Sequence, residues 1–152
     1  LFTLTLLMFI GASPGSTGGG IKTSTLFTLL QTVRGVASGK APVAFKRSIP
    51  RDVILKAFIV TLLSALVVCV GAFVLSVLEP EYSFMQNLFE ITSAFGTVGL
   101  STGITPFLSN ASKILIVLIM FIGRLGPLTI ASLWAYKTEP HARYSEENIT
   151  IG

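Results

Sequence analysis

Long apolar runs dominate the hydrophobic pattern of this chain and predict membrane-spanning helices. Residues 57–78 form a run of 22 residues without a charge, and residues 114–136 form a run of 23 residues whose single charge is Arg124. Each run has the length of about 20 residues that a helix needs to cross the hydrocarbon core of a bilayer. A helix is required there, because lipid offers no partner for free backbone N–H and C=O groups. A third apolar run, LFTLTLLMFI, opens the chain.

The 35 residues between the two long runs predict a helix of about half the spanning length. Ser83 and Gln86 have the spacing of a capping box, ahead of an apolar stretch, and Gly96 is expected to end the helix near Ala94 or Phe95. Such a helix has about 12 residues and is about 18 Å long. A half-length helix followed by glycine-interrupted extended backbone is typical of a re-entrant loop. Membrane depth allows such a loop only when it faces protein or a water-filled path.

The segment after this half-helix, TVGLSTG at residues 97–103, has the composition of an ion selectivity filter. A pore helix followed by Thr-Val-Gly is how potassium channels present backbone carbonyls that replace the hydration shell of the ion. We expect Thr97 to offer its hydroxyl and its carbonyl, Val98 to pack behind the filter, and Gly99 to adopt a conformation that a Cβ would hinder. The alternative is a polar external turn, since Thr-Val-Gly alone is a common tripeptide. The position after a capped half-helix and between two spans favours the filter.

Glycines and a proline interrupt what would otherwise be one helix from residue 1 to about residue 37. Glycine costs about 1 kcal/mol and proline about 3 kcal/mol inside a helix, so the helix is expected to break. The interrupting residues are Gly11, Pro14, Gly15, Gly18, Gly19 and Gly20, and the hydroxyls among them belong to Ser13, Ser16 and Thr17. A phosphate-binding loop is one alternative, but that motif requires Gly-Lys as neighbours, and Ile21 separates Gly20 from Lys22. A helix that is merely kinked, with small residues for close packing, is another.

Composition and charge agree with a membrane protein and indicate its orientation. Apolar residues make up 51% of the chain and charged residues 12%, with a mean hydropathy of +0.79, whereas soluble domains have about 25% charged residues. The net charge of +4 could suggest nucleic acid, but the basic residues concentrate between Arg34 and Lys56, and acids dominate residues 79–113. Basic loops mark the cytoplasmic side. The first long span should therefore run outward and the second return, with lipid rather than nucleic acid as the partner.

Other residues carry little chemistry. Cys69 is the single cysteine and lies in an apolar run, and His141 is the single histidine and lies in a polar tail. The apolar runs contain no carboxylate or histidine cluster, which counts against an enzyme. The chain begins inside an apolar run without a methionine, so we expect it to be part of a longer protein.

An internal repeat supports a modular organisation. The string MFIG occurs at residues 8–11 and again at residues 120–123, each time late in an apolar run and shortly before a proline. With GSTGGGIKT, FEITSAFGTVGLSTG and FIGRLGP, nearly the whole chain resembles the C-terminal part of the Trk/Ktr/HKT superfamily of potassium transporters, most closely the membrane subunits of its Ktr branch. The resemblance implies the end of a third repeat and a complete fourth repeat.

The resemblance implies an all-α polytopic membrane protein, with potassium-channel-like M1–pore helix–M2 repeats around a central pore. Residues 1–37 would be the broken M2 helix of the preceding repeat with an intramembrane gating loop at 11–20, and residues 38–55 a basic cytoplasmic loop. Residues 56–136 would be the complete repeat, with M1 at 56–78, pore helix at 83–95, filter at 96–101 and M2 at 113–136. Residues 137–152 would be a cytoplasmic tail.

The resemblance also implies the function and the roles of single residues. K⁺ would be transported through filter carbonyls that include those of Thr97, Val98, Gly99 and Leu100, with Na⁺ as a candidate coupling or activating ion. Arg124 would lie beside the gating loop, with loop carbonyls as its partners; a structural pairing with an acid elsewhere in the protein is the alternative. Glu90 is expected to be hydrogen-bonded for packing and not to bind the ion.

The resemblance implies two partners, a second copy of the protein and a cytosolic nucleotide-binding ring. Nucleotide would bind only to the ring, and the protein would lie in the plasma membrane. No cofactor is expected on the chain itself. A membrane-bound nucleotide-binding module or enzyme that uses the glycine-rich loop is the alternative function.

Overall fold

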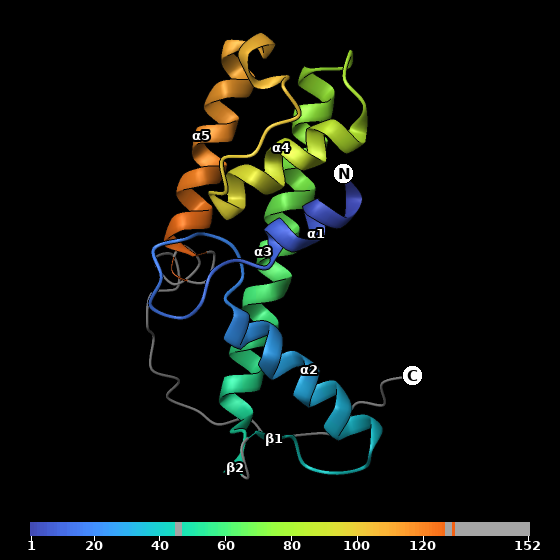
Figure 1. Ribbon diagram of the computed structural model, residues 1–152, viewed down its shortest axis with the longest axis vertical. Coiled ribbons are helices and arrows are strands. Elements are labelled where there is room, and N and C mark those ends of the chain that lie inside the picture. Colours follow the sequence, from blue (N-terminus) through green and yellow to red (C-terminus); the bar gives the residue numbers. More distant parts are fainter. Residues whose placement is uncertain (45–46, 127–128, 130–152) are drawn as a thin grey trace, which may run out of the picture.

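The computed structural model describes residues 1–44, 47–126 and 129, and the fold is helical apart from one short hairpin (Figure 1). The described helices are α1 Phe2–Phe9, α2 Thr23–Ala37, α3 Arg51–Leu78, α4 Phe84–Gly96, a 3-10 turn η1 at Thr105–Phe107, and α5 Asn110–Leu125. Strands β1 Val43–Ala44 and β2 Arg47–Ser48 pair antiparallel, with Val43 opposite Ser48 and Ala44 opposite Arg47.

The long helix α3 is the axis of the structure. α1, α4 and α5 gather around its C-terminal half, whereas α2 packs along its N-terminal half, above the β-hairpin (Figure 1). Among the described residues α3 is the one helix that is long and apolar enough to cross a membrane. Its 28 residues correspond to about 42 Å at 1.5 Å per residue, more than the hydrocarbon core requires.

Two predicted boundaries are wrong. The basic loop was expected to reach residue 55, but Pro50 caps α3 and the helix begins at Arg51, because proline before the first turn suits a helix start. The second span was expected from residue 113, but α5 begins after its N-cap Ser109, whose hydroxyl accepts the backbone N–H of Ser112. α5 ends at Leu125, and Gly126 follows with φ +85°.

Several predicted segments lie outside the described residues. They are residues 45 and 46 of the basic loop, residues 127, 128 and 130–136 of the second predicted span, and the tail at 137–152.

The core lies where α3, α4 and α5 meet. It is built by seven buried apolar residues: Val68, Ala72, Leu75, Ile91, Ala94, Phe95 and Ile119. Phe9 at the end of α1 stacks on Phe95, with ring centroids 6.1 Å apart. This contact joins α1 to the C-terminal end of α4. By contrast, large apolar side chains along α3 such as Phe58, Leu62 and Phe73 are exposed, as expected for a surface that meets lipid or further protein.

The ends of α3 and α5 are tied together by a carboxylate. Glu79 follows α3, and its Oε1 accepts the backbone N–H of Ser109 at 2.8 Å and the hydroxyl of Ser112 at 2.7 Å. These hydrogen bonds, the one from the Ser109 backbone first, hold the pKa of Glu79 below its ordinary value. The first turn of α5 is thus fixed against the last turn of α3.

Candidate functional site

The half-helix α4 ends where the predicted filter begins. Its N-terminus has the expected capping box: the Ser83 hydroxyl accepts the Gln86 N–H at 3.4 Å, and the Gln86 side chain accepts the Ser83 N–H at 3.0 Å. At the other end Thr97 adopts the left-handed conformation with φ 51° and ψ 40°. Because helices commonly end through one left-handed residue, Thr97 is where the chain leaves α4.

The predicted filter residues after Thr97 are exposed within this chain. Gly99 has φ +83°, and a Cβ built on it would meet no atom within 4 Å. Its need for glycine is therefore conformational and not steric. Val98 was expected to pack behind the filter, but it is 45% exposed and Leu100 is 48% exposed. Within this chain the Val98 side chain faces an open pocket, and its packing behind the filter stays a prediction.

The glycine-rich loop, residues 11–20, is closed at its base. Ile10 and Ile21 form a parallel backbone bridge, in which the Gly11 N–H donates to the Ile21 carbonyl at 2.7 Å and the Ile21 N–H donates to the Phe9 carbonyl at 3.2 Å. The chain therefore leaves α1, makes a closed excursion, and returns beside its own exit point before α2. Helix is broken across the whole of this loop, as the glycines and the proline predict.

Lys22 ties the loop internally. Its Nζ donates to the carbonyl of Ser16 at 3.0 Å and to the carbonyl of Gly18 at 2.8 Å. The tip of the loop, residues 13–17, is exposed, whereas Gly19 is buried. The sequence pattern suggested Lys22 only as a phosphate ligand, and this role was not predicted. The sequence does contain a signal for this role: a lysine follows a run of glycines, and no side chains shield the carbonyls of glycines from its ammonium group.

The loop touches the start of the predicted filter. The Gly19 N–H donates to the Thr97 hydroxyl at 2.9 Å, across 78 residues of sequence. A Cβ built on Gly19 would lie 2.5 Å from the Phe95 carbonyl oxygen and 3.2 Å from that of Gly123. A Cβ on Gly123 would overlap the same Phe95 carbonyl. The backbones of the loop, the end of α4 and the end of α5 thus meet at a distance that only glycines permit.

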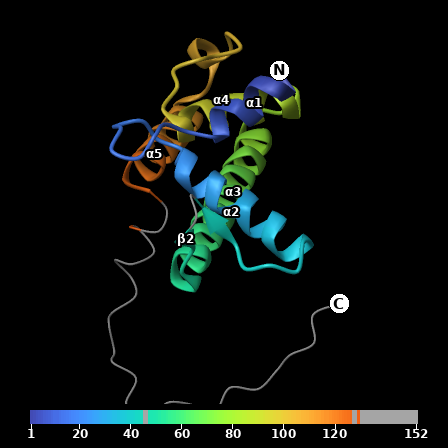
Figure 2. The same cartoon turned by 60° about the horizontal axis from the view of Figure 1, so that its bottom comes forward.

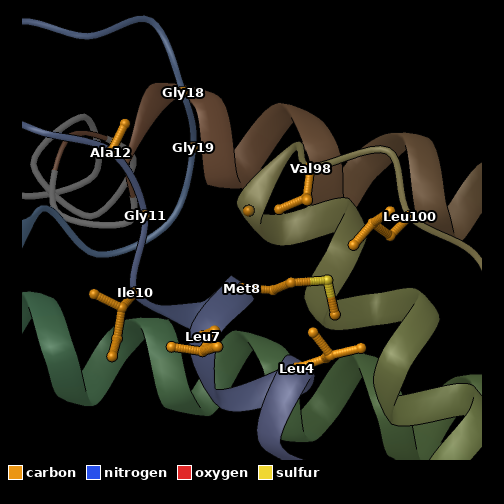
Figure 3. Close-up of a pocket in the computed structure, with 11 residues that line it drawn as sticks. Leu4, Leu7, Met8, Ile10, Gly11, Ala12, Gly18, Gly19, Val98 and Leu100 are labelled. Atoms are coloured by element: carbon orange, nitrogen blue, oxygen red, sulfur yellow. The ribbon is translucent and has the colours of Figure 1, made fainter. Parts of the chain in front are cut away.

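An open pocket of about 390 Å³ lies against this junction. Figure 3 shows Leu4, Leu7 and Met8 of α1 on one side and Val98 and Leu100 on the other, with the loop closing one end. The pocket is therefore bounded by both predicted functional segments, the loop and the filter.

Arg124 lies in the last turn of α5, beside Gly123, and is exposed. It was expected at the centre of a span and bonded to loop carbonyls. Among the described residues it makes no hydrogen bond to the loop, and the carbonyls of Ser16 and Gly18 are bound by Lys22 instead. Its neighbour Gly123 lies close to the loop at Gly19, and a role of Arg124 beside the loop stays a prediction.

The structure thus combines a half-length helix, a non-helical segment at its C-terminus, and a glycine-rich loop that contacts the end of the helix and Thr97. The chain belongs to the TrkH family of cation transport proteins, whose model matches residues 1–146. The resemblance predicted from the sequence is thereby confirmed.

The chain is similar to potassium uptake proteins from several bacteria. It is 44% identical to Ktr system potassium uptake protein B of Bacillus subtilis, over 100% of this chain and 34% of that protein. It is 39% identical to potassium/sodium uptake protein NtpJ of Enterococcus hirae, over 96% of this chain and 34% of that protein. It is 36% identical to Ktr system potassium uptake protein B of Vibrio alginolyticus, over 100% of this chain and 33% of that protein. The chain spans about a third of the length of these curated relatives.

Proposed function

We propose that the protein containing this chain passes K⁺ across the membrane and that this chain supplies its fourth repeat and the end of its third. In this assignment α1, the glycine-rich loop and α2 are the broken M2 helix of the third repeat. α3 is M1, α4 is the pore helix and α5 is M2 of the fourth repeat. The relatives named as potassium uptake proteins support the ion, and the helix order supports the repeat.

The filter assignment is supported by the direction of α4. Its C-terminus carries the negative end of the helix dipole, and the non-helical backbone at residues 97–100 begins there. Carbonyl oxygens in that segment can replace water around a dehydrated cation. Gly99, with its φ of +83°, gives the backbone the freedom to turn a carbonyl toward the ion path. One repeat supplies one side of the pore, so the other repeats of the full-length protein complete the filter.

The gate assignment is carried by the hydrogen bond from the Gly19 N–H to the Thr97 hydroxyl. This bond holds the loop against the inner end of the filter segment, where a loop would obstruct ions that leave the filter. The loop is closed at its base by the Ile10–Ile21 bridge and is held internally by Lys22. It can therefore move aside as a unit once the contact with Thr97 is lost. Arg124, beside the loop, adds positive charge to the exit.

A nucleotide site in the same loop is disfavoured by its hydrogen bonds. A phosphate-binding loop presents free backbone N–H groups and a free lysine to the phosphate. Here the N–H groups of Gly11, Gly18 and Gly19 donate within the protein, and the Lys22 ammonium binds loop carbonyls. The TrkH family and the named relatives are transporters, which agrees with the expectation that the protein is not an enzyme.

The location and partners follow from charge and from the resemblance. We propose that the protein is a multi-pass protein of the plasma membrane, with the basic end of α3 and the tail in the cytoplasm. A second copy and a nucleotide-binding ring are the proposed partners, and the basic surface at Lys40, Arg47 and Arg51 is the proposed docking surface for the ring. Nucleotide would bind to the ring alone, and Na⁺ is the proposed coupling or activating ion.

The test of the transport function is ion uptake by the full-length protein in lipid vesicles. Uptake of K⁺, Rb⁺ and Na⁺ tracers is compared with uptake by vesicles without protein, and nucleotide binding to the membrane protein is measured separately. We expect K⁺ and Rb⁺ uptake well above Na⁺ uptake. We expect no direct binding of nucleotide to this membrane protein. Equal uptake of all three ions at the level of empty vesicles would overturn the proposal.

A further inference from the structure

Glu90 is a buried carboxylate in the middle of α4. Its side chain is 5% exposed. An ionisable side chain at membrane depth is costly and therefore needs partners. In the described residues, all of its hydrogen-bond partners belong to residues 101–105, which follow the proposed filter carbonyls of Thr97 to Leu100.

Four donors converge on this carboxylate. Oε1 accepts the Ser101 hydroxyl at 2.8 Å, the Thr102 backbone N–H at 2.7 Å and the Thr102 hydroxyl at 2.9 Å. Oε2 accepts the Thr105 hydroxyl at 2.7 Å. Hydrogen bonds to a charged acceptor are about twice as strong as those between neutral groups. Glu90 thus ties to α4 a stretch of chain that has neither helix nor strand between Gly99 and Ile104.

The hydrogen bonds of Glu90 matter because the space behind the filter segment is open. A cavity of about 230 Å³ lies between the filter segment and the two helices α4 and α5, lined among others by Glu90, Thr97, Gly99 and Met120. Side chains therefore do not fill the space behind Gly99, and a Cβ there would meet no neighbour. Packing on that side therefore does little to fix the position of Gly99.

Hydrogen bonds at its two ends are what remain to position the segment. At the inner end, the Thr97 and Val98 N–H groups donate to the Ala94 and Ser93 carbonyls at 3.0 Å, and the Thr97 hydroxyl accepts the Gly19 N–H. At the outer end, Ser101 and Thr102 bind Glu90. The carbonyls between these two points are those that the proposed filter uses.

We propose that Glu90 is a positioning residue for the filter: by holding Ser101, Thr102 and Thr105, it sets the spacing of the carbonyls from Thr97 to Leu100 and thereby the preference for K⁺ over Na⁺. This inference rests on the proposed K⁺ transport function. We assign Glu90 to positioning and not to ion binding, because four protein donors already engage its carboxylate. A smaller ion is rejected only as long as the carbonyls cannot close around it, and an anchored backbone resists that closure.

The test compares three substitutions at the anchor in the full-length protein. Glu90→Leu removes the acceptors at similar volume. Glu90→Gln keeps an acceptor in the place of Oε1, and its amide group can donate to the Thr105 hydroxyl, so the anchor survives without charge. Thr105→Val removes one of the four bonds. Glu81→Gln is the matched control, because Glu81 is exposed and precedes α4.

The measured quantity is the ratio of K⁺ to Na⁺ uptake in vesicles, together with the amount of folded protein. For Glu90→Leu we expect the ratio to fall about tenfold, the change that corresponds to about 1.4 kcal/mol of differential ion binding. Thr105→Val should lower the ratio by less, and Glu90→Gln should keep it within about threefold of wild type, which is about half that energy. Glu81→Gln should leave the ratio unchanged.

A purely structural role would lower the amount of folded protein and both fluxes equally, at a constant ratio, and that result would overturn the inference. A ratio that falls as far for Glu90→Gln as for Glu90→Leu would also overturn it, since charge and not anchoring would then matter. If Glu90→Leu does not fold, Thr105→Val decides: an unchanged ratio contradicts the anchor. Failure of the wild-type protein to take up K⁺ would instead refute the proposed function.

Discussion

Substitution of Gly19 by alanine tests the contact between the glycine-rich loop and the filter segment. The added Cβ would lie 2.5 Å from the Phe95 carbonyl oxygen, and 3.2 Å from the carbonyl oxygen of Gly123. Both neighbours are backbone atoms and cannot turn away as a side chain could. The loop must therefore move off the end of α4, and the bond from the Gly19 N–H to Thr97 is lost with that movement.

The size of the effect follows from the cost of overpacking. An extra methyl group in a tightly packed site typically costs about 1–3 kcal/mol, and 1–3 kcal/mol changes an equilibrium about 5–150-fold. If the loop obstructs the path, this energy is subtracted from the obstructed state. We expect Gly19→Ala to raise K⁺ flux at least about fivefold under conditions where the wild-type gate is mostly closed.

The assay is tracer uptake by full-length protein in vesicles, with Na⁺ uptake measured in parallel. Ser24→Ala is the control, because Ser24 is exposed in the first turn of α2, beyond the loop. A higher flux with the wild-type K⁺/Na⁺ ratio means that the loop moved and the filter did not. Folded Gly19→Ala protein with unchanged or lower flux would refute the gate.

Three further predictions concern the gate and the outer contact between α3 and α5. Deletion of residues 13–19 should raise K⁺ flux more than Gly19→Ala does, and Arg124→Ala should raise it more weakly. If the deletion and Arg124→Ala act on one gate, a double-mutant cycle should show less than additive effects. Wild-type flux in the folded deletion variant would count against the gate. Lys22→Gln, which removes the ammonium bound to two loop carbonyls, should raise flux by less than the deletion, and a lower flux would show that Lys22 serves another purpose. Glu79→Ala should lower the thermal midpoint of the protein at pH 7. Because the folded-state pKa of Glu79 is lowered from 4.5, the difference in midpoint from wild type should persist above pH 4.5 and vanish as the pH falls below it. A difference that is constant with pH would exclude the ionised carboxylate as its cause.

Local signals predicted the local structure well. The spacing of Ser83 and Gln86 predicted the capping box, and both of its hydrogen bonds are present. The glycines and proline of residues 11–20 predicted a break, and α1 and α2 lie on either side of it. These features depend on a few neighbouring residues, so a sequence contains nearly all of the relevant information.

Long-range contacts could not be predicted in the same way. The bond between Gly19 and Thr97 joins two backbones that are far apart in sequence, and no residue type announces it. Glu90 was expected to be hydrogen-bonded, but its partners at residues 101–105 depend on how the chain turns after Thr97. The exposure of Val98 likewise depends on the pocket that α1 and the segment after α4 form together, and not on its neighbours in sequence.

The most direct test of K⁺ transport through this filter is the ion preference of the Gly99→Ser variant of the full-length protein. Serine at φ +83° is strained, so the backbone must shift and one row of filter carbonyls with it. Competition of K⁺ and Na⁺ against Rb⁺ uptake gives the affinity for each ion, with Gly39→Ser as a control, since Gly39 also has positive φ and lies far from the filter, after α2. We predict a weaker K⁺ affinity and a lower K⁺/Na⁺ ratio for Gly99→Ser alone. Wild-type affinity and ratio in folded Gly99→Ser protein would contradict the assignment of this segment as the filter.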